Sequence, residues 1–176
     1  MTKVWRGKNG TLKIDKASDV TITSANNLLG FFSSATTVAT IKDVTVTPPE
    51  VTADKVDMIG TTSSFQNAEL EKKPVGMAKI SGTIVLDSDE GFETEVFASS
   101  TAISSPVAAT RYQIGNGSEQ DVAILVQLLD SADCVQFAMD NAVFKLGDVK
   151  ITADGHAEQS FEVICLPRDF YLEFYN

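Results

Sequence analysis

The chain has 176 residues, the usual length of one domain and too short for two large ones. Hydrophobic residues make up 43% and charged residues 22%, which excludes an intrinsically disordered chain. The net charge of −10 argues against a general nucleic-acid-binding protein, because such proteins need clustered Lys and Arg. Val, Thr and Ile are abundant, and β-branched residues favour strands, so we expect a mainly β fold.

The charges are unevenly distributed along the chain. Residues 1–79 have a small basic excess, whereas residues 80–176 hold the whole acidic excess. We therefore expect an acidic face beside a nearly neutral one, for which an ordinary solvated surface is the simplest interpretation.

Alternating residues predict strands in the first part of the chain. The turn signal Asn9-Gly10 before the alternating segment 11–15 predicts an opening hairpin, and residues 20–23 predict a short strand. The pattern over 37–47 predicts one long, two-faced strand. Pro48 and Pro49 end it, because proline cannot continue the hydrogen-bonded ladder.

Residues 48–76 form the least regular segment, and we interpret them as a long loop or an extended hairpin arm. Structureless loops of this length are uncommon in compact domains. The segment contains Val56, Met58, Ile59 and Phe65, which need to be buried against the domain itself or against a neighbouring subunit.

Residues 77–87 predict the next strand, with Ala78, Ile80, Gly82, Ile84 and Leu86 on one face. A helix near 88–100 is expected to follow, because Asp87 or Ser88 suits its N-cap and acidic residues suit its first turn.

The last part of the chain is rich in strand signals. The predicted strands are 111–114, 122–129, 134–139, 142–146, 149–152, 161–166 and 170–175. Residues 1–176 are therefore expected to form a single domain of two packed antiparallel sheets, a sandwich or partly closed barrel, with one flanking α-helix.

Residues with catalytic or metal-binding chemistry are scarce. His156 is the single histidine and lies in a turn-like setting, while Cys134 and Cys165 lack the paired spacing of a zinc site and are expected to be reduced. No nucleophile or phosphate-binding motif is present. We expect no enzymatic activity, no cofactor and no metal.

The sequence starts without a signal-peptide pattern and has no apolar stretch of the roughly 20 residues that span a bilayer, so neither secretion by a signal peptide nor membrane insertion is expected.

Three segments carry a resemblance to a known family: 42–50, 55–60 with 65–67, and 78–87. In these segments, and in the order of its elements, the chain resembles the major tail tube proteins of long-tailed bacteriophages and archaeal tailed viruses. The resemblance implies two packed β-sheets with a flanking helix, and hexameric rings that stack into a tube. It also implies a virion structural protein, made in the host cytoplasm, whose tube conducts the tape-measure protein and genomic double-stranded DNA without binding the DNA specifically. Tail-end proteins would be further partners.

The resemblance gives the irregular segment 48–76 a role as an arm that reaches the adjacent ring. The expected inter-ring contacts are Val56, Asp57, Met58, Ile59 and Phe65, with residues 168–175 as a second candidate. The expected lumen wall is formed by Thr40, Lys42, Lys79, Ser81 and Thr83. The two lysines conflict with an acidic lumen unless the acids within 121–162 compensate them or face outward.

Two other functions remain open from the residues. One is a secretion-system tube protein, which would also form rings. The other is a monomeric β-sandwich that binds a protein or a glycan. Self-association distinguishes both tube functions from the third.

Overall fold

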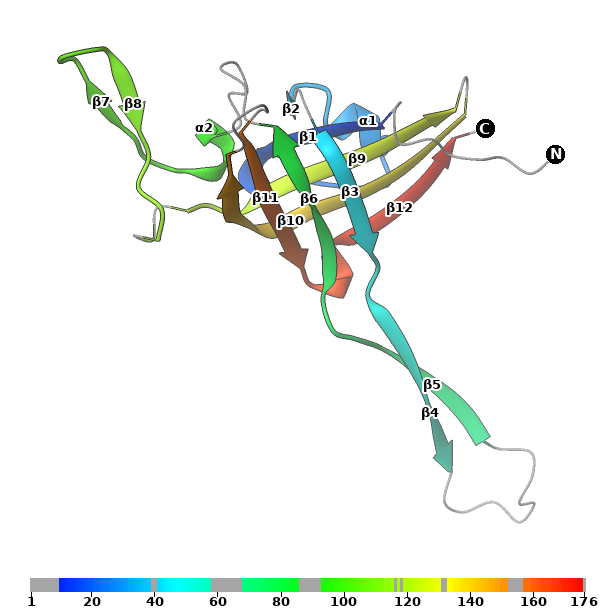
Figure 1. Cartoon of the computed structure of the whole chain (residues 1–176). Coiled ribbons are helices and arrows are strands. Elements are labelled where there is room, and N and C mark those ends of the chain that lie inside the picture. The colour runs from blue at the N-terminus through cyan, green and yellow to red at the C-terminus, as the bar shows by residue number, and fades with distance from the viewer. Residues whose placement is uncertain are drawn as a thin grey trace.

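Antiparallel strands dominate the computed structural model, as the β-branched composition predicts (Figure 1). The fold class inferred from the sequence, mainly β with packed antiparallel layers, is confirmed. The structure describes residues 10–38, 41–57, 68–85, 93–115, 117, 119–130, 133–151 and 157–175.

One continuous sheet of eight strands folds into two layers, which we call layer I and layer II. The layers share a single long strand, β10 (Asp133–Lys150). Layer I contains the first half of β10 with β1 (Gly10–Lys16), β2 (Thr36–Val38), β9 (Val122–Asp130) and β12 (Phe170–Tyr175). Layer II contains the second half of β10 with β11 (Glu158–Cys165), β6 (Ala78–Val85) and β3 (Ile41–Thr47).

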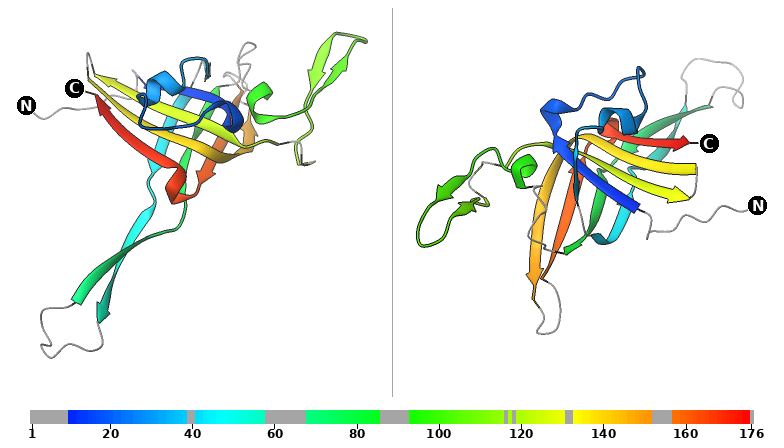
Figure 2. Two further views of the ribbon diagram at one scale, coloured as in Figure 1. Left: turned by 180° about the vertical axis from the view of Figure 1, so that it is seen from behind. Right: turned by 90° about the horizontal axis from the view of Figure 1, so that it is seen from above.

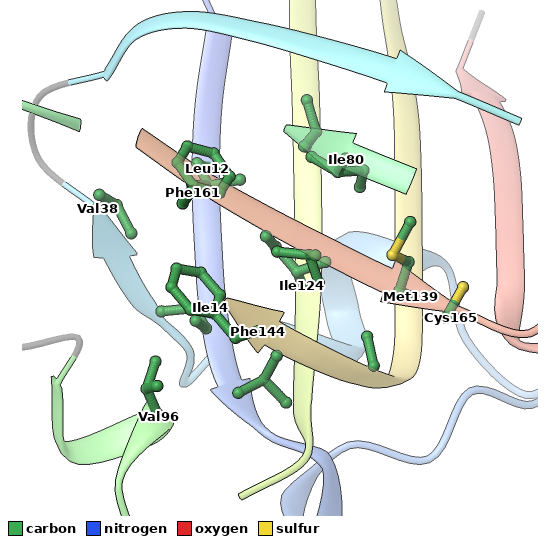
Figure 3. Close-up of a cluster of buried hydrophobic side chains, with 14 of the residues drawn as sticks. Leu12, Ile14, Val38, Ile80, Val96, Ile124, Met139, Phe144, Phe161 and Cys165 are labelled. Carbon is green, nitrogen blue, oxygen red and sulfur yellow. The ribbon is translucent and has the colours of Figure 1, made fainter. Parts of the chain in front are cut away.

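The main hydrophobic core lies between the two layers (Figure 3). Layer I contributes residues such as Leu12 and Ile124, and layer II contributes Ile80 and Phe161, all at most 3% exposed. The rings of Phe144 and Phe161 stack with a centroid distance of 5.7 Å and an interplanar angle of 3°. Burial on this scale is the main stabilising contribution to the fold.

A β-bulge lets β10 serve both layers. Met139 lies opposite Ile124, but Ala142 lies opposite Val122, so β10 has one extra residue at this point. The extra residue reverses the alternation of side chains: odd-numbered residues such as Met139 face the core in layer I, and even-numbered residues such as Phe144 face it in layer II.

The helices are short and cover the margins of the sheet. Helix α1 (Leu28–Phe31) covers a second apolar cluster on the far side of layer I, and Asn27 caps it by accepting the Gly30 N–H at 2.8 Å. Helix α2 (Glu93–Val96) places the buried Val96 at one end of the main core. Two 3₁₀ turns, η2 (Ala17–Asp19) and η3 (Pro167–Asp169), follow β1 and β11.

Several expected elements differ from the structure. The long strand expected over 37–47 is two strands, β2 and β3, which lie at opposite ends of the sheet. The strands expected at 134–139, 142–146 and 149–152 are one strand, β10. Of the helix expected near 88–100, the described part is α2 alone; it ends at Val96, and residues 101–103 form a strand. Residues 20–23 form no strand, and the strand expected at 111–114 ends at Arg111.

Two hairpins extend beyond the two layers (Figure 1, Figure 2). Strands β4 (Glu50–Asp57) and β5 (Ala68–Val75) pair with each other and project from the ends of β3 and β6. We call this hairpin the arm. Strands β7 (Thr101–Ile103) and β8 (Ala109–Arg111) form a shorter hairpin on the other side of the molecule.

Gly82 of β6 permits the close approach of β3, and its replacement tests this packing. A Cβ atom at Gly82 would overlap the backbone carbonyl oxygen of Asp43 and meet the Phe161 ring at 3.0 Å. We expect Gly82→Ala to lower the free energy of unfolding by about 1–3 kcal/mol, measured by urea denaturation. Ser81→Ala, on the opposite face of the same strand, is the control and should change it by less; equal losses would contradict this account.

Candidate assembly surfaces

The outer face of layer II, which points away from the core, brings together most of the expected lumen residues. Even-numbered residues of β6 face the core, so Lys79, Ser81 and Thr83 face outward. Lys42 of β3 lies on the same outer face, where it reaches β11. Thr40 lies outside the described residues.

Lys42 reaches the outer face because of a bulge in β3. Ile41 pairs with Ile84 and Asp43 pairs with Thr83, so Lys42 is the extra residue. Its ammonium donates to both carboxylate oxygens of Glu158, at 2.9 and 3.0 Å. This hydrogen bond, with the attraction between the two charges, raises the pKa of Lys42.

Lys79 is also paired with a glutamate of β11. Its ammonium contacts Glu162, and the Lys145 ammonium lies 3.7 Å from the other oxygen of the same carboxylate. The hydrogen bond from Lys79 is the main reason why the pKa of Glu162 is lowered. Both lysines of the expected lumen wall are therefore neutralised by acids from the acid-rich part of the chain. Their place in a lumen stays a prediction.

Layer II has two strand edges without a neighbouring strand among the described residues. β3 pairs with β6 alone. The second half of β10 pairs with β11 alone, because pairing with β9 stops at Ala142 and pairing with β12 stops at Met139. Unpaired edges of this kind present backbone N–H and C=O groups that another chain can pair with.

Two cavities border the free edge of β10. Their volumes are about 370 and 540 Å³, and Val143 and Lys145 line both of them. Exposed apolar residues surround the edge: Met77 lines the first cavity and is 61% exposed, Ile114 lines the second and is 64% exposed, and Val149 is 49% exposed. The edge therefore combines unpaired backbone with apolar surface, which is typical of an interaction site.

The arm carries the residues that we expected to contact the next ring. Val56 and Asp57 are the last two residues of β4, opposite Glu69 and Ala68. Met58, Ile59 and Phe65 lie outside the described residues. At the base of the arm, Val51 is 61% exposed. The contact role of these five residues stays a prediction.

The C-terminal strand β12, part of the second expected contact segment, has an apolar exposed side. Leu172 is 50% and Phe174 is 62% exposed. On the opposite side, Glu173 accepts the Leu28 N–H at 2.7 Å and Tyr171 donates to Asp140 at 3.0 Å. One side of β12 is thereby fixed to layer I and α1. Its other side, with Leu172 and Phe174, is free to contact another subunit.

The described residues offer little catalytic chemistry. Burial raises the pKa of the Cys165 thiol to about 12, so it stays protonated and unreactive. No group of three His, Cys, Asp or Glu side chains within the described ranges is arranged to hold a metal ion, and His156 lies outside them. None of the described helices has the length and hydropathy to span a membrane.

Comparisons with known proteins give distant structural likenesses. No family model and no curated protein matches the chain. Its fold is similar to the tube-terminating cap of the anti-feeding prophage, at 10% identity and a TM-score of 0.49, covering 99% of this chain and 94% of that one. It is also similar to the sheath/tube terminator of the extracellular contractile injection system PVC in its extended state, at 11% identity and a TM-score of 0.47, covering 100% and 99%. At these TM-scores neither likeness carries a conclusion about this chain.

The ion pair of Glu162 predicts a specific pH response. Because the folded-state pKa of Glu162 is lowered, the pair stabilises the fold above the ordinary glutamate pKa, and this stabilisation is lost as the pH falls through the lowered value. We expect Lys79→Met to raise the pKa of Glu162 in a carboxyl NMR titration. Lys145→Met is the control and should raise it less, since that ammonium is more distant. The reverse order would contradict the assignment of Lys79 as the main partner.

Proposed function

We propose that this chain is a structural protein of a tail tube, whose copies join head to tail into rings. One observation carries the proposal: within the described part of the chain, layer II is a four-stranded antiparallel sheet with a free edge on each side. A surface that differs on its two sides makes heterologous contacts, which close into a ring when the rotation permits.

The strand directions of layer II suit such a ring. β3, β6, β11 and β10 alternate in direction, because every pair in this layer is antiparallel. When two copies are placed side by side in the same orientation, β3 of one copy therefore runs antiparallel to β10 of the next. We call this contact the seam. Closing the ring through such seams satisfies the backbone groups of both edges and leaves no free edge in layer II.

The polar outer face of layer II suits the bore of the tube. Its opposite face is covered by layer I, so the outer face is the one available to line a channel. The face carries hydroxyl groups, and glutamates already neutralise its lysines Lys42 and Lys79. DNA sliding past such a wall meets few unpaired cations to bind, and the net charge of −10 repels it further.

The remaining parts of the proposal follow from the resemblance in sequence. The rings would be hexameric and would stack through the arm, and the tube would conduct the tape-measure protein and genomic DNA in a virion tail. The protein would have no enzymatic activity and would need no cofactor. A secretion-system tube protein would use the same seams, and a monomeric binding module would use none.

Ring formation and its dependence on the edge of β10 can be tested together. We expect the purified protein to form rings or tubes in electron microscopy. Val149, half-exposed at the free edge, would be covered in the seam, so Val149→Asp should prevent rings while leaving the monomer folded. Val107→Asp, at a residue 74% exposed between β7 and β8, is the matched control. A wild-type protein that stays monomeric at high concentration would overturn the proposal.

The arm is tested by a variant that leaves the seam unchanged. Met58→Asp combined with Phe65→Asp should prevent the stacking of rings into tubes, because interface cores are depleted of charge. Single rings should still form, and negative-stain images distinguish them from tubes. Tubes of normal length would reject the arm as the stacking contact.

A further inference from the structure

The two free edges of layer II carry opposite charges on their outer face. Asp43 lies on β3 and Lys150 lies at the end of β10, and both are exposed. Within the described residues, neither side chain forms an ion pair. Each edge therefore offers an unpaired charge to a neighbour.

Layer II shows why Lys150 has no acidic partner among the described residues. Lys150 lies directly opposite Glu158 in the ladder between β10 and β11. Both carboxylate oxygens of Glu158 accept hydrogen bonds from Lys42, which reaches them from β3. Asp43 contributes a weaker electrostatic attraction to Lys42 but forms no ion pair with it among the described residues. The ion pair between Lys42 and Glu158 thus leaves Asp43 as an anion on the β3 edge and Lys150 as a cation on the β10 edge.

The two charges lie at different levels along the strands. Asp43 pairs with Thr83, which pairs with Ser160 of β11. Lys150 pairs with Glu158, two positions from Ser160 along the same strand. A seam that brings Asp43 beside Lys150 is therefore staggered by two residues. Stagger of this kind is required for strands to tilt as a sheet closes around an axis.

We propose that Asp43 of one copy forms an ion pair with Lys150 of the next copy, and that this pair sets the register of the seam. The inference rests on the proposed function, because it needs the seam. It names the second copy of the chain as the partner and two residues as determinants of how the copies align.

The alternative registers are less favourable electrostatically. Without stagger, Asp43 would lie opposite the β10 bulge at Gly147 and Asp148, where a second carboxylate is exposed. A stagger in the opposite direction would place Asp43 beside Lys145, which already lies 3.7 Å from Glu162. Of these three registers, the one that brings Asp43 beside Lys150 joins two opposite charges that have no ion-pair partner among the described residues of one copy.

Charge reversal tests the pair. We expect Asp43→Lys and Lys150→Glu, each alone, to raise the concentration for half-assembly about fivefold or more, measured by sedimentation velocity at low salt. Arg111→Glu, at an exposed cation of β8 outside layer II, is the matched control and should leave this concentration unchanged. Circular dichroism melting confirms that each variant is folded.

Two rescues distinguish a contact between copies from an effect within one copy. The double variant with both reversals should assemble like the wild type. An equal mixture of the two single variants should also assemble, since each seam of an alternating ring then joins opposite charges. High salt should reduce both the loss of assembly in the single variants and the gain from the rescues, because it screens the charges.

Other results overturn the inference in distinguishable ways. If Asp43→Lys is rescued by Lys145→Glu, the opposite stagger holds and the pair with Lys150 is wrong. If the charge variants assemble normally while Val149→Asp does not, the seam exists without this pair. If the wild type forms no rings, both the pair and the proposed function fail.

Discussion

The rest of the structure depends on the extra residue in β10 between Met139 and Ala142. It reverses which side chains face the core, so one strand of 18 residues supplies apolar side chains to both layers. Without this reversal, Phe144 would point outward in layer II and the core would lose its stacked ring pair with Phe161. At the same place β10 parts from β9 and β12, so its second half has one neighbouring strand in the described part of the chain.

Local alternation in the sequence predicted the strands that keep a regular pleat. The face of β6 with Ala78, Ile80 and Ile84 is buried as expected, and β12 begins and ends at the expected residues. Bulges caused the error in β10, which was expected as three separate strands. The gaps left between the expected strands, at 140–141 and 147–148, are the two bulges of β10, because Asp, Asn and Gly suit a bulge as well as a turn. Sequence pattern alone does not separate these two conformations.

The candidate surfaces were predictable only in part, because local spacing predicts the direction of a side chain but not its partners. The outward direction of Lys79, Ser81 and Thr83 follows from their spacing of two. The partners of the two lysines do not follow from spacing, since Glu158 is 116 residues from Lys42 in the sequence. The free edge of β10 was also not predictable, because it depends on where pairing with β9 ends along one continuous strand.

The attachment of the arm has a mechanical consequence. β4 continues from the end of β3, and β5 leads into the start of β6, so a pull on the arm acts on both strands in the same direction (Figure 1). Such a force does not peel β3 from β6. It loads the ladder between β6 and β11 in shear, from Ala78 opposite Cys165 to Val85 opposite Glu158, so that all its rungs resist together. The arm is thus anchored in the direction in which a sheet is mechanically strongest.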